Sequence, residues 1–289
     1  MTKTRRWLLL TVYGLAVAVL FAYFLFPSEA VKGYIAFKLN AAAPDLTVDM
    51  AVVKPSFPPG LKLTTVHLER NGGGLLDAGK VIIRPDYVSL LGADKVYRFK
   101  ATLYDGIVEG TLHLGQGSGT NPMEVDAIFQ GVKVEQIKLF ETMTGRTVVG
   151  TLNGTVHARR AKGFSLEATA DLKLSDGRVA LLMPVFTYKD LTFKLIEADL
   201  ELKDRTLDIM RCSIKGQPAD ATLNGTIALR EPLNKSLLNI EGTVKPQPAL
   251  LALLRKSLPA NLIPQTGTDA DGIGIALSGT LESPGFAFR

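Results

Sequence analysis

Residues 164–174 read Phe-Ser-Leu-Glu-Ala-Thr-Ala-Asp-Leu-Lys-Leu, with an apolar side chain at every second position. Residues 221–229, Ala-Thr-Leu-Asn-Gly-Thr-Ile-Ala-Leu, follow the same alternation. Successive side chains of a β-strand point to opposite faces, so a period of two is typical of a strand with one apolar and one water-facing side. The alternation recurs from about residue 45 onward and predicts a mostly β body.

The alternation changes phase within residues 191–202. Phe193 and Leu195 hold the apolar phase first, and Ile196 and Ala198 hold it afterwards. A slip of one residue turns a strand's apolar side chains onto the other face of the sheet. We therefore predict a β-bulge or bend between Leu195 and Ile196.

A short motif, apolar–any–Gly–Thr–apolar, occurs five times in the body. Its copies span residues 108–112, 152–156, 223–227, 240–244 and 277–281. Each glycine falls in the apolar phase, where a missing side chain permits close approach of a covering element or strong curvature of the sheet. The copies lie 17 to 71 residues apart, which does not fit a strict solenoid. We expect one curved, mainly antiparallel sheet.

Two segments depart from the β pattern and predict short helices. Residues 134–143 carry apolar side chains at helical spacing and are followed by Gly145. Residues 249–258 are bounded by Pro248 and Pro259. Each helix is expected to cover one end of the sheet.

The stretch from Trp7 to Phe26 contains no charged residue. At 1.5 Å per residue, a helix of that length spans about 30 Å, the thickness of a bilayer core. Trp7, Tyr23 and Phe26 are the expected anchor residues, because aromatic rings favour the membrane interface at the two ends of a span. The only charged residues before the stretch are basic: Lys3, Arg5 and Arg6.

The positive-inside rule then predicts the order of the chain. Residues 1–6 form a cytoplasmic tail, residues 7–26 a single transmembrane helix, residues 27–44 a linker, and residues 45–289 a periplasmic β domain. The alternative is a cleaved signal peptide, with Ser28 and Ala30 at the positions that a signal peptidase requires. The apolar run is longer than the usual 7–15 residues of a signal peptide, which favours an anchor that is kept.

The amino-acid composition excludes several classes of protein. The hydrophobic fraction of 46% and the charged fraction of 21% fit neither a disordered tail nor a polytopic membrane protein. Much of the net charge of +5 lies in the first six residues, and no concentrated basic cluster predicts a nucleic-acid partner. The single cysteine, Cys212, excludes an intrachain disulfide.

The sequence predicts no catalytic residues, no bound metal and no cofactor. It contains neither a Gly-x-x-x-x-Gly-Lys-Ser/Thr run nor a His-Glu-x-x-His motif. His113 and His157 occupy equivalent positions after the Gly-Thr motif, either as metal ligands paired across a sheet or, as we expect, as solvated strand residues. Cys212 lies in an alternating run, which favours a buried small apolar side chain over a nucleophile. Residues 56–60, Ser-Phe-Pro-Pro-Gly, are either a turn or a docking segment.

The order of these features resembles the AsmA-like proteins of Gram-negative bacteria. The resemblance runs through the anchor, the Pro-Asp-Tyr-Val-Ser-Leu-Leu-Gly turn at residues 85–92, the Gly-Thr strands and the ending at residues 277–286. Residues 214–233 and 236–240 are more particularly similar to the protein N family of the type II secretion system (GspN). The resemblance implies a curved AsmA-like β-sheet, a groove or half-barrel, in a protein of the inner membrane. It brings no catalytic residues.

Two functions compete on this basis. The resemblance to protein N implies a non-enzymatic component of the type II secretion system that aids protein export across the outer membrane, with other secretion-system proteins and the inner membrane as partners. The alternative is an AsmA-like protein that binds or transfers lipid between the membranes, with phospholipid acyl chains in an apolar groove. An exported hydrolase is disfavoured, because no acid–base constellation is found. The expected groove residues hold the apolar phase of their strands: Leu152, Val156, Leu166, Leu172, Leu223 and Ile227.

Overall fold

The structure is a computed structural model of the chain. It describes residues 3–42, 46–70, 73–115, 123–137, 147–160, 166–185, 188–248, 250, 252 and 272–288. Two α-helices come first, α1 (Lys3–Phe24) and α2 (Ser28–Ala42). The strands that follow are β1 (Leu46–Ser56), β2 (Gly60–Arg70), β3 (Gly73–Pro85), β4 (Lys95–Leu103), β5 (Gly106–Leu114), β6 (Met123–Lys133), β7 (Val148–Arg160), β8 (Leu166–Val185), β9 (Tyr188–Lys203), β10 (Thr206–Gln217), β11 (Ala219–Ala228), β12 (Leu237–Pro246), β13 (Ile273–Thr280) and β14 (Pro284–Phe288).

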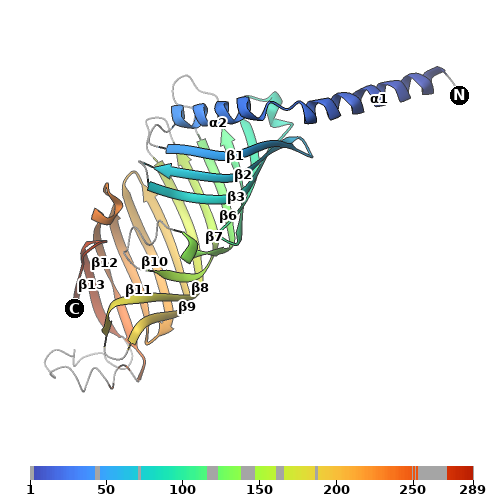
Figure 1. Cartoon of the computed structure of the whole chain (residues 1–289). Helices are drawn as coiled ribbons and strands as arrows, with labels where there is room; N and C mark the ends of the chain where they lie inside the picture. Colours follow the sequence, from blue (N-terminus) through green and yellow to red (C-terminus); the bar gives the residue numbers. More distant parts are fainter. Residues whose placement is uncertain are drawn as a thin grey trace.

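In the described part of the chain, all 14 strands belong to one open sheet. Each strand from β2 to β13 pairs with the strand before it and the strand after it, β1 and β14 end the sheet, and the paired strands run antiparallel. Figure 1 shows the strands side by side from β1, beside α2, to β13 at the far end of the sheet. The mostly β, antiparallel body that the alternation predicts is confirmed.

The register gives the sheet one apolar face along its whole width. Residues directly opposite each other on paired strands share a face, so a row of partners can be followed from strand to strand. One such row, the apolar row, crosses β1 to β13 without a polar side chain. Its members are Val53, Leu63, Val81, Ala101, Val108, Phe129, Gly154, Leu172, Ala198, Cys212, Leu223, Gly242 and Ile275.

The predicted bulge in β9 is confirmed, one residue earlier than expected. On β10, Lys215 pairs with Leu195 and the next residue, Gly216, pairs with Phe193. Lys194 is therefore the extra residue. Its insertion lets Phe193 and Ile196 both take the apolar face, although they lie three positions apart.

The glycines of the repeated motif stand where a neighbouring strand comes too close for a side chain. A Cβ atom on Gly154 would overlap the carbonyl oxygen of Asp171 on β8, and one on Gly225 would overlap that of Asn239 on β12. Both glycines also have positive φ angles, 154° and 143°, which side chains rarely tolerate. The crowding partner is thus the next strand of the same sheet and not a covering element.

Residues 27–44, predicted as a linker, form helix α2 over Ser28–Ala42. Val31 and Ile35 lie one turn apart and pack with Phe26 against the fully buried Met50 and Val53. The helix covers the apolar face where the sheet begins (Figure 1). Packing against the sheet stabilises this helix. Its sequence contains no strand-like alternation that would have drawn attention to it.

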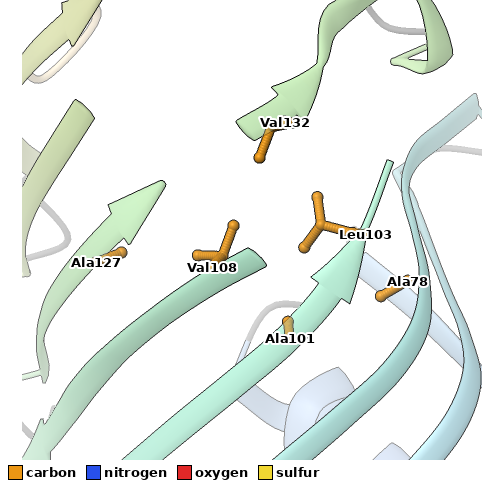
Figure 2. Packing of buried hydrophobic residues seen from close by; sticks show 6 residues of the cluster. All are labelled: Ala78, Ala101, Leu103, Val108, Ala127 and Val132. Atoms are coloured by element: carbon orange, nitrogen blue, oxygen red, sulfur yellow. The ribbon is translucent and has the colours of Figure 1, made fainter. Parts of the chain in front are cut away.

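A second buried cluster lies farther along the same face. Leu103, Val108 and Val132 point toward one another from β4, β5 and β6 (Figure 2). Small residues, Ala78, Ala101 and Ala127, fill the spaces between them. This alternation of large and small side chains packs the N-terminal half of the apolar face.

The structure describes only parts of the two segments that were predicted to form short helices. At residues 134–143, Val134–Gln136 form a single 3-10 turn and Ile137 is extended, while residues 138–146 lie outside the described residues. Most of residues 249–258 also lie outside them. The short helix over residues 134–143 is therefore not continuous from its first turn.

Helix α1 projects away from the sheet (Figure 1). Trp7 is 72% exposed and Tyr23 is 53% exposed, and the Tyr23 ring contacts the Phe24 ring edge to face at 5.9 Å. Phe26, the third predicted anchor residue, instead packs on the sheet with α2. Among the residues described, no helix is both long enough and apolar enough to cross a membrane. The span at residues 7–26 stays a prediction.

Candidate functional site

The six predicted groove residues all lie on the apolar face. Leu172 and Leu223 are members of the apolar row. Leu152 and Val156 flank Gly154 at alternate positions of β7, and Ile227 lies four positions from Leu223 on β11. Leu166 occupies the same face at the start of β8, opposite Arg160. Five of the six side chains are half-buried, and Leu166 is 36% exposed.

Residues of β9 and β10 connect these positions into a continuous surface. Leu174 on β8 pairs with Ile196, and Ile196 pairs with Ile214 on β10. Leu200 and Ile209 extend the surface in the same way. These residues of β8, β9 and β10 were not among the predicted groove residues. The phase slip in β9 conceals which of its side chains share a face with those of β7 and β11.

Among the described residues, the apolar face is least covered on β8 to β11. In the part of the chain that the structure describes, the buried apolar side chains of β7 to β14 are Ile240 on β12 and Ile273 and Ile275 on β13, and the other buried apolar side chains lie between Met50 and Val134. The side chains on β8 to β11 are half-buried. This part of the face therefore retains apolar surface that its own side chains do not cover.

The opposite face of the sheet is polar and carries cross-strand ion pairs. Arg159 donates to Glu167 at 2.6 Å, and Lys173 lies 2.7 Å from Glu197. Hydrogen bonding to Arg159 lowers the pKa of Glu167, and hydrogen bonding to Lys173 lowers that of Glu197. All four groups are water-exposed, so each pair stabilises the fold only weakly. The two faces of the sheet are chemically distinct.

The two motif histidines lie on this polar face and are separated by β6. His157 Nδ1 lies 2.7 Å from Asp126 Oδ1, and His157 Nε2 lies 3.4 Å from Glu124 Oε1. His113 is the register partner of Glu124 on the other side. Each histidine thus faces a carboxylate of β6 and not the other histidine. One ligand atom each from Glu124, Asp126 and His157 lies within 4.8 Å of the others, so these three residues could hold a metal ion. The solvated role of the histidines stays a prediction.

Cys212 lies in the apolar row between Ala198 and Leu223. Burial raises the pKa of its thiol, which keeps the neutral form dominant at neutral pH. The side chain is half-buried and behaves as a small apolar residue.

A polar hollow of about 570 Å³ lies at the bulges of β8 to β10. Arg178, Lys194 and Lys215 line it together with Asp176 and Asp220. No basic cluster is evident in the sequence, because these three basic residues are far apart along the chain. The bulges bring them together in the folded sheet. The two carboxylates offset much of their charge.

Comparison of the chain with models of protein families, with curated protein sequences and with solved structures gives no match. The function is therefore inferred from the apolar face of the sheet and from the sequence of the predicted anchor.

Proposed function

We propose that this chain is a non-enzymatic, membrane-anchored protein whose sheet holds phospholipid acyl chains on its apolar face. The observation that carries the proposal is the apolar row, which crosses 13 strands without a polar side chain. At a strand spacing of 4.7–4.9 Å the row is about 58 Å long, against about 15 Å for the hydrocarbon of one leaflet. Such a surface has room for several chains in succession.

Partial exposure of this face supports a ligand. Soluble proteins rarely leave more than a few hundred Å² of contiguous apolar surface in water. Half-buried apolar side chains such as Ile196 and Ile214 lie side by side on this face, and the small residues Ala198 and Cys212 lie between Leu172 and Leu223 in the row. Acyl chains match this surface because they need no polar partner. Transfer between the inner and outer membranes is the AsmA-like activity that we propose for it.

Helix α1 supports attachment to the inner membrane. No charge interrupts the sequence from Trp7 to Phe26, and large side chains such as Leu10 and Phe21 are 61% and 58% exposed. The basic residues at the start of the helix, Lys3, Arg5 and Arg6, favour a cytoplasmic N-terminus and a periplasmic sheet. Anchoring would hold the apolar face next to a supply of lipid.

The test places a photoreactive residue at Leu223, on the apolar face, or at the adjacent Thr222, which is exposed on the polar face. We expect irradiation of cells to crosslink phospholipid at Leu223 and not at Thr222. Equal labelling at both positions, or none at either, would contradict lipid binding on the apolar face.

We also propose that the chain serves the type II secretion system, on the strength of its resemblance to the protein N family. Residues 214–233 and 236–240, which carry the resemblance, fall on β10, β11, β12 and the turns between them. Deleting the gene should then lower secretion of a folded enzyme by that system, and full-length protein should restore it. Undiminished secretion in the deletion strain would remove this second proposal and leave lipid binding intact.

A further inference from the structure

Two neighbouring turns expose large apolar side chains at one edge of the sheet. Phe57, between β1 and β2, is 88% exposed, and Val88 and Leu91, between β3 and β4, are 81% and 92% exposed. Tyr87 and Leu90 complete the group, which we name the apolar tip. Single exposed apolar residues are ordinary, whereas a gathered group marks an interaction surface.

Hydrogen bonds hold the two turns together and fix their shape. The Tyr87 hydroxyl donates to the carbonyl of Pro59 at 2.8 Å and so joins one turn to the other. The Lys95 ammonium donates to the carbonyls of Leu90 and Gly92 at 2.8 and 2.7 Å. The apolar tip is therefore built to present its side chains to the exterior, since its backbone groups are satisfied within the turn.

The apolar tip lies at the edge of the sheet where α1 arrives. Tyr23 and Phe24 of α1 line a hollow together with residues 52–55, the end of β1. Phe57 follows that strand end by two residues. Phe24 itself is 74% exposed. The exposed end of α1 and the apolar tip thus lie near the same end of β1.

Basic side chains line the polar face directly behind the apolar tip. Lys54 pairs with Lys62 across β1 and β2, and Arg84 pairs with Arg98 across β3 and β4. Like charges directly opposite each other destabilise a sheet, so each pair favours an anion beside it. Asp86 binds Arg98 at 3.0 Å, but Arg84 Nε is buried and has no hydrogen-bond partner among the described residues. Arg84 and Arg98 border a hollow of about 780 Å³ beside Tyr87 and Val88 of the apolar tip.

We propose that the apolar tip inserts into the interface of the bilayer that holds α1, while the four basic residues behind it contact anionic lipid headgroups. The inference rests on the proposed function, because it takes α1 to be in the membrane. Apolar and aromatic side chains backed by cations are the composition that binds at a membrane surface. Two contacts with one bilayer fix the orientation of the sheet, with strand ends toward the lipid, so acyl chains reach the apolar face from this edge.

The test uses full-length protein reconstituted into vesicles of phosphatidylethanolamine and phosphatidylglycerol. Cys212→Ser removes the native thiol, and an environment-sensitive fluorophore is attached to Leu91→Cys or, as the control, to Thr102→Cys. Thr102 is exposed near the other end of β4. We expect spin-labelled lipids to quench the fluorophore at position 91 and to leave the fluorophore at position 102 unquenched.

Flotation of the same vesicles separates failure of this inference from failure of the proposed function. If the labelled proteins float with the vesicles and position 91 is as unquenched as position 102, the apolar tip does not dock, although α1 still anchors the chain. If no labelled protein floats with vesicles, both the anchor and the docking are overturned.

A charge variant tests the headgroup contact. Each basic residue near an anionic surface strengthens binding about fivefold, so Lys54→Gln with Lys62→Gln should weaken docking of the apolar tip about 25-fold. Quenching at position 91 should fall in vesicles with phosphatidylglycerol and stay unchanged in vesicles of phosphatidylcholine alone. An equal effect in both lipids would overturn the role of the anionic headgroup.

Discussion

Gly154 illustrates how closely neighbouring strands approach in this sheet. A Cβ atom at this position would overlap the carbonyl oxygen of Asp171, and the positive φ of Gly154 adds strain to any substitution. The adjacent Thr155 is exposed on the polar face. The two positions therefore form a matched pair for substitution.

We predict that Gly154→Val destabilises the protein by about 2–3 kcal/mol, through overpacking and backbone strain. Thr155→Val should stay within about 0.5 kcal/mol, as surface substitutions usually do. Thermal unfolding followed by circular dichroism measures both. Indistinguishable melting temperatures would mean that β7 and β8 do not crowd each other at Gly154.

The sequence alone predicted which face of the sheet most of these residues take. It did not predict which residue of the neighbouring strand each one contacts. The period of two assigned Leu152, Leu172 and Leu223 to one face, because alternation needs no knowledge of the fold. It also placed Gly154 in the apolar phase. It did not identify Asp171 as the crowding partner, because strand register depends on contacts between distant segments.

At the scale of elements, α2 is the principal departure from the sequence prediction. Its apolar side chains, Val31 and Ile35, are few, and their burial depends on Met50 and Val53 of β1. Helical propensity is a weak signal, and packing of an amphipathic face stabilises most helices in proteins. A segment read without its partner strand therefore looks like a linker.

We predict that Ile35→Ala destabilises the protein by about 1–2 kcal/mol, the lower part of the usual range, because the side chain is only half-buried. Phe37→Ala is the control, since Phe37 is 68% exposed on the same helix. Its effect should stay within about 0.5 kcal/mol. Urea denaturation of both variants measures the difference, and a larger loss for Phe37→Ala would place the packed face of α2 elsewhere.

The bulge of β9 could be predicted from the sequence of that strand alone, whereas α2 could not be predicted without its partner strand. A phase change is recorded in the strand itself, since Phe193 and Ile196 cannot both be in phase without an inserted residue. The polar hollow at the same bulges was not predictable. Arg178, Lys194 and Lys215 meet only after three strands have paired.

At the scale of the whole molecule, the proposal requires the sheet to lie outside the cytoplasm. We predict that alkaline phosphatase fused after residue 289 is active in intact cells and that β-galactosidase fused there is not. The basic residues in the first turn of α1 favour this orientation. Active β-galactosidase at that position would contradict the topology, whatever the sheet binds.

The functional site of the whole molecule was predicted only in outline. Six residues with the apolar phase were assigned to one groove, and the structure places them on one face. The surface is wider than the prediction, because every strand from β1 to β13 adds a member to the apolar row. The segment around Phe57 was predicted to be either a turn or a docking segment, and the one at Leu91 to be a turn. Their exposure depends on how the first hairpins meet the helices.

The up-and-down order of the strands has a consequence for how the protein comes into being. Each strand finds its partner in the segment made just before it, so pairing advances along the chain without waiting for distant sequence. A chain that is synthesised from its N-terminus can assemble one hairpin at a time, in the manner of a repeat protein. Adding or deleting one whole hairpin changes the length of the sheet by about 10 Å and leaves the facing of every other side chain unchanged. The reach of such a protein can therefore evolve in steps of two strands.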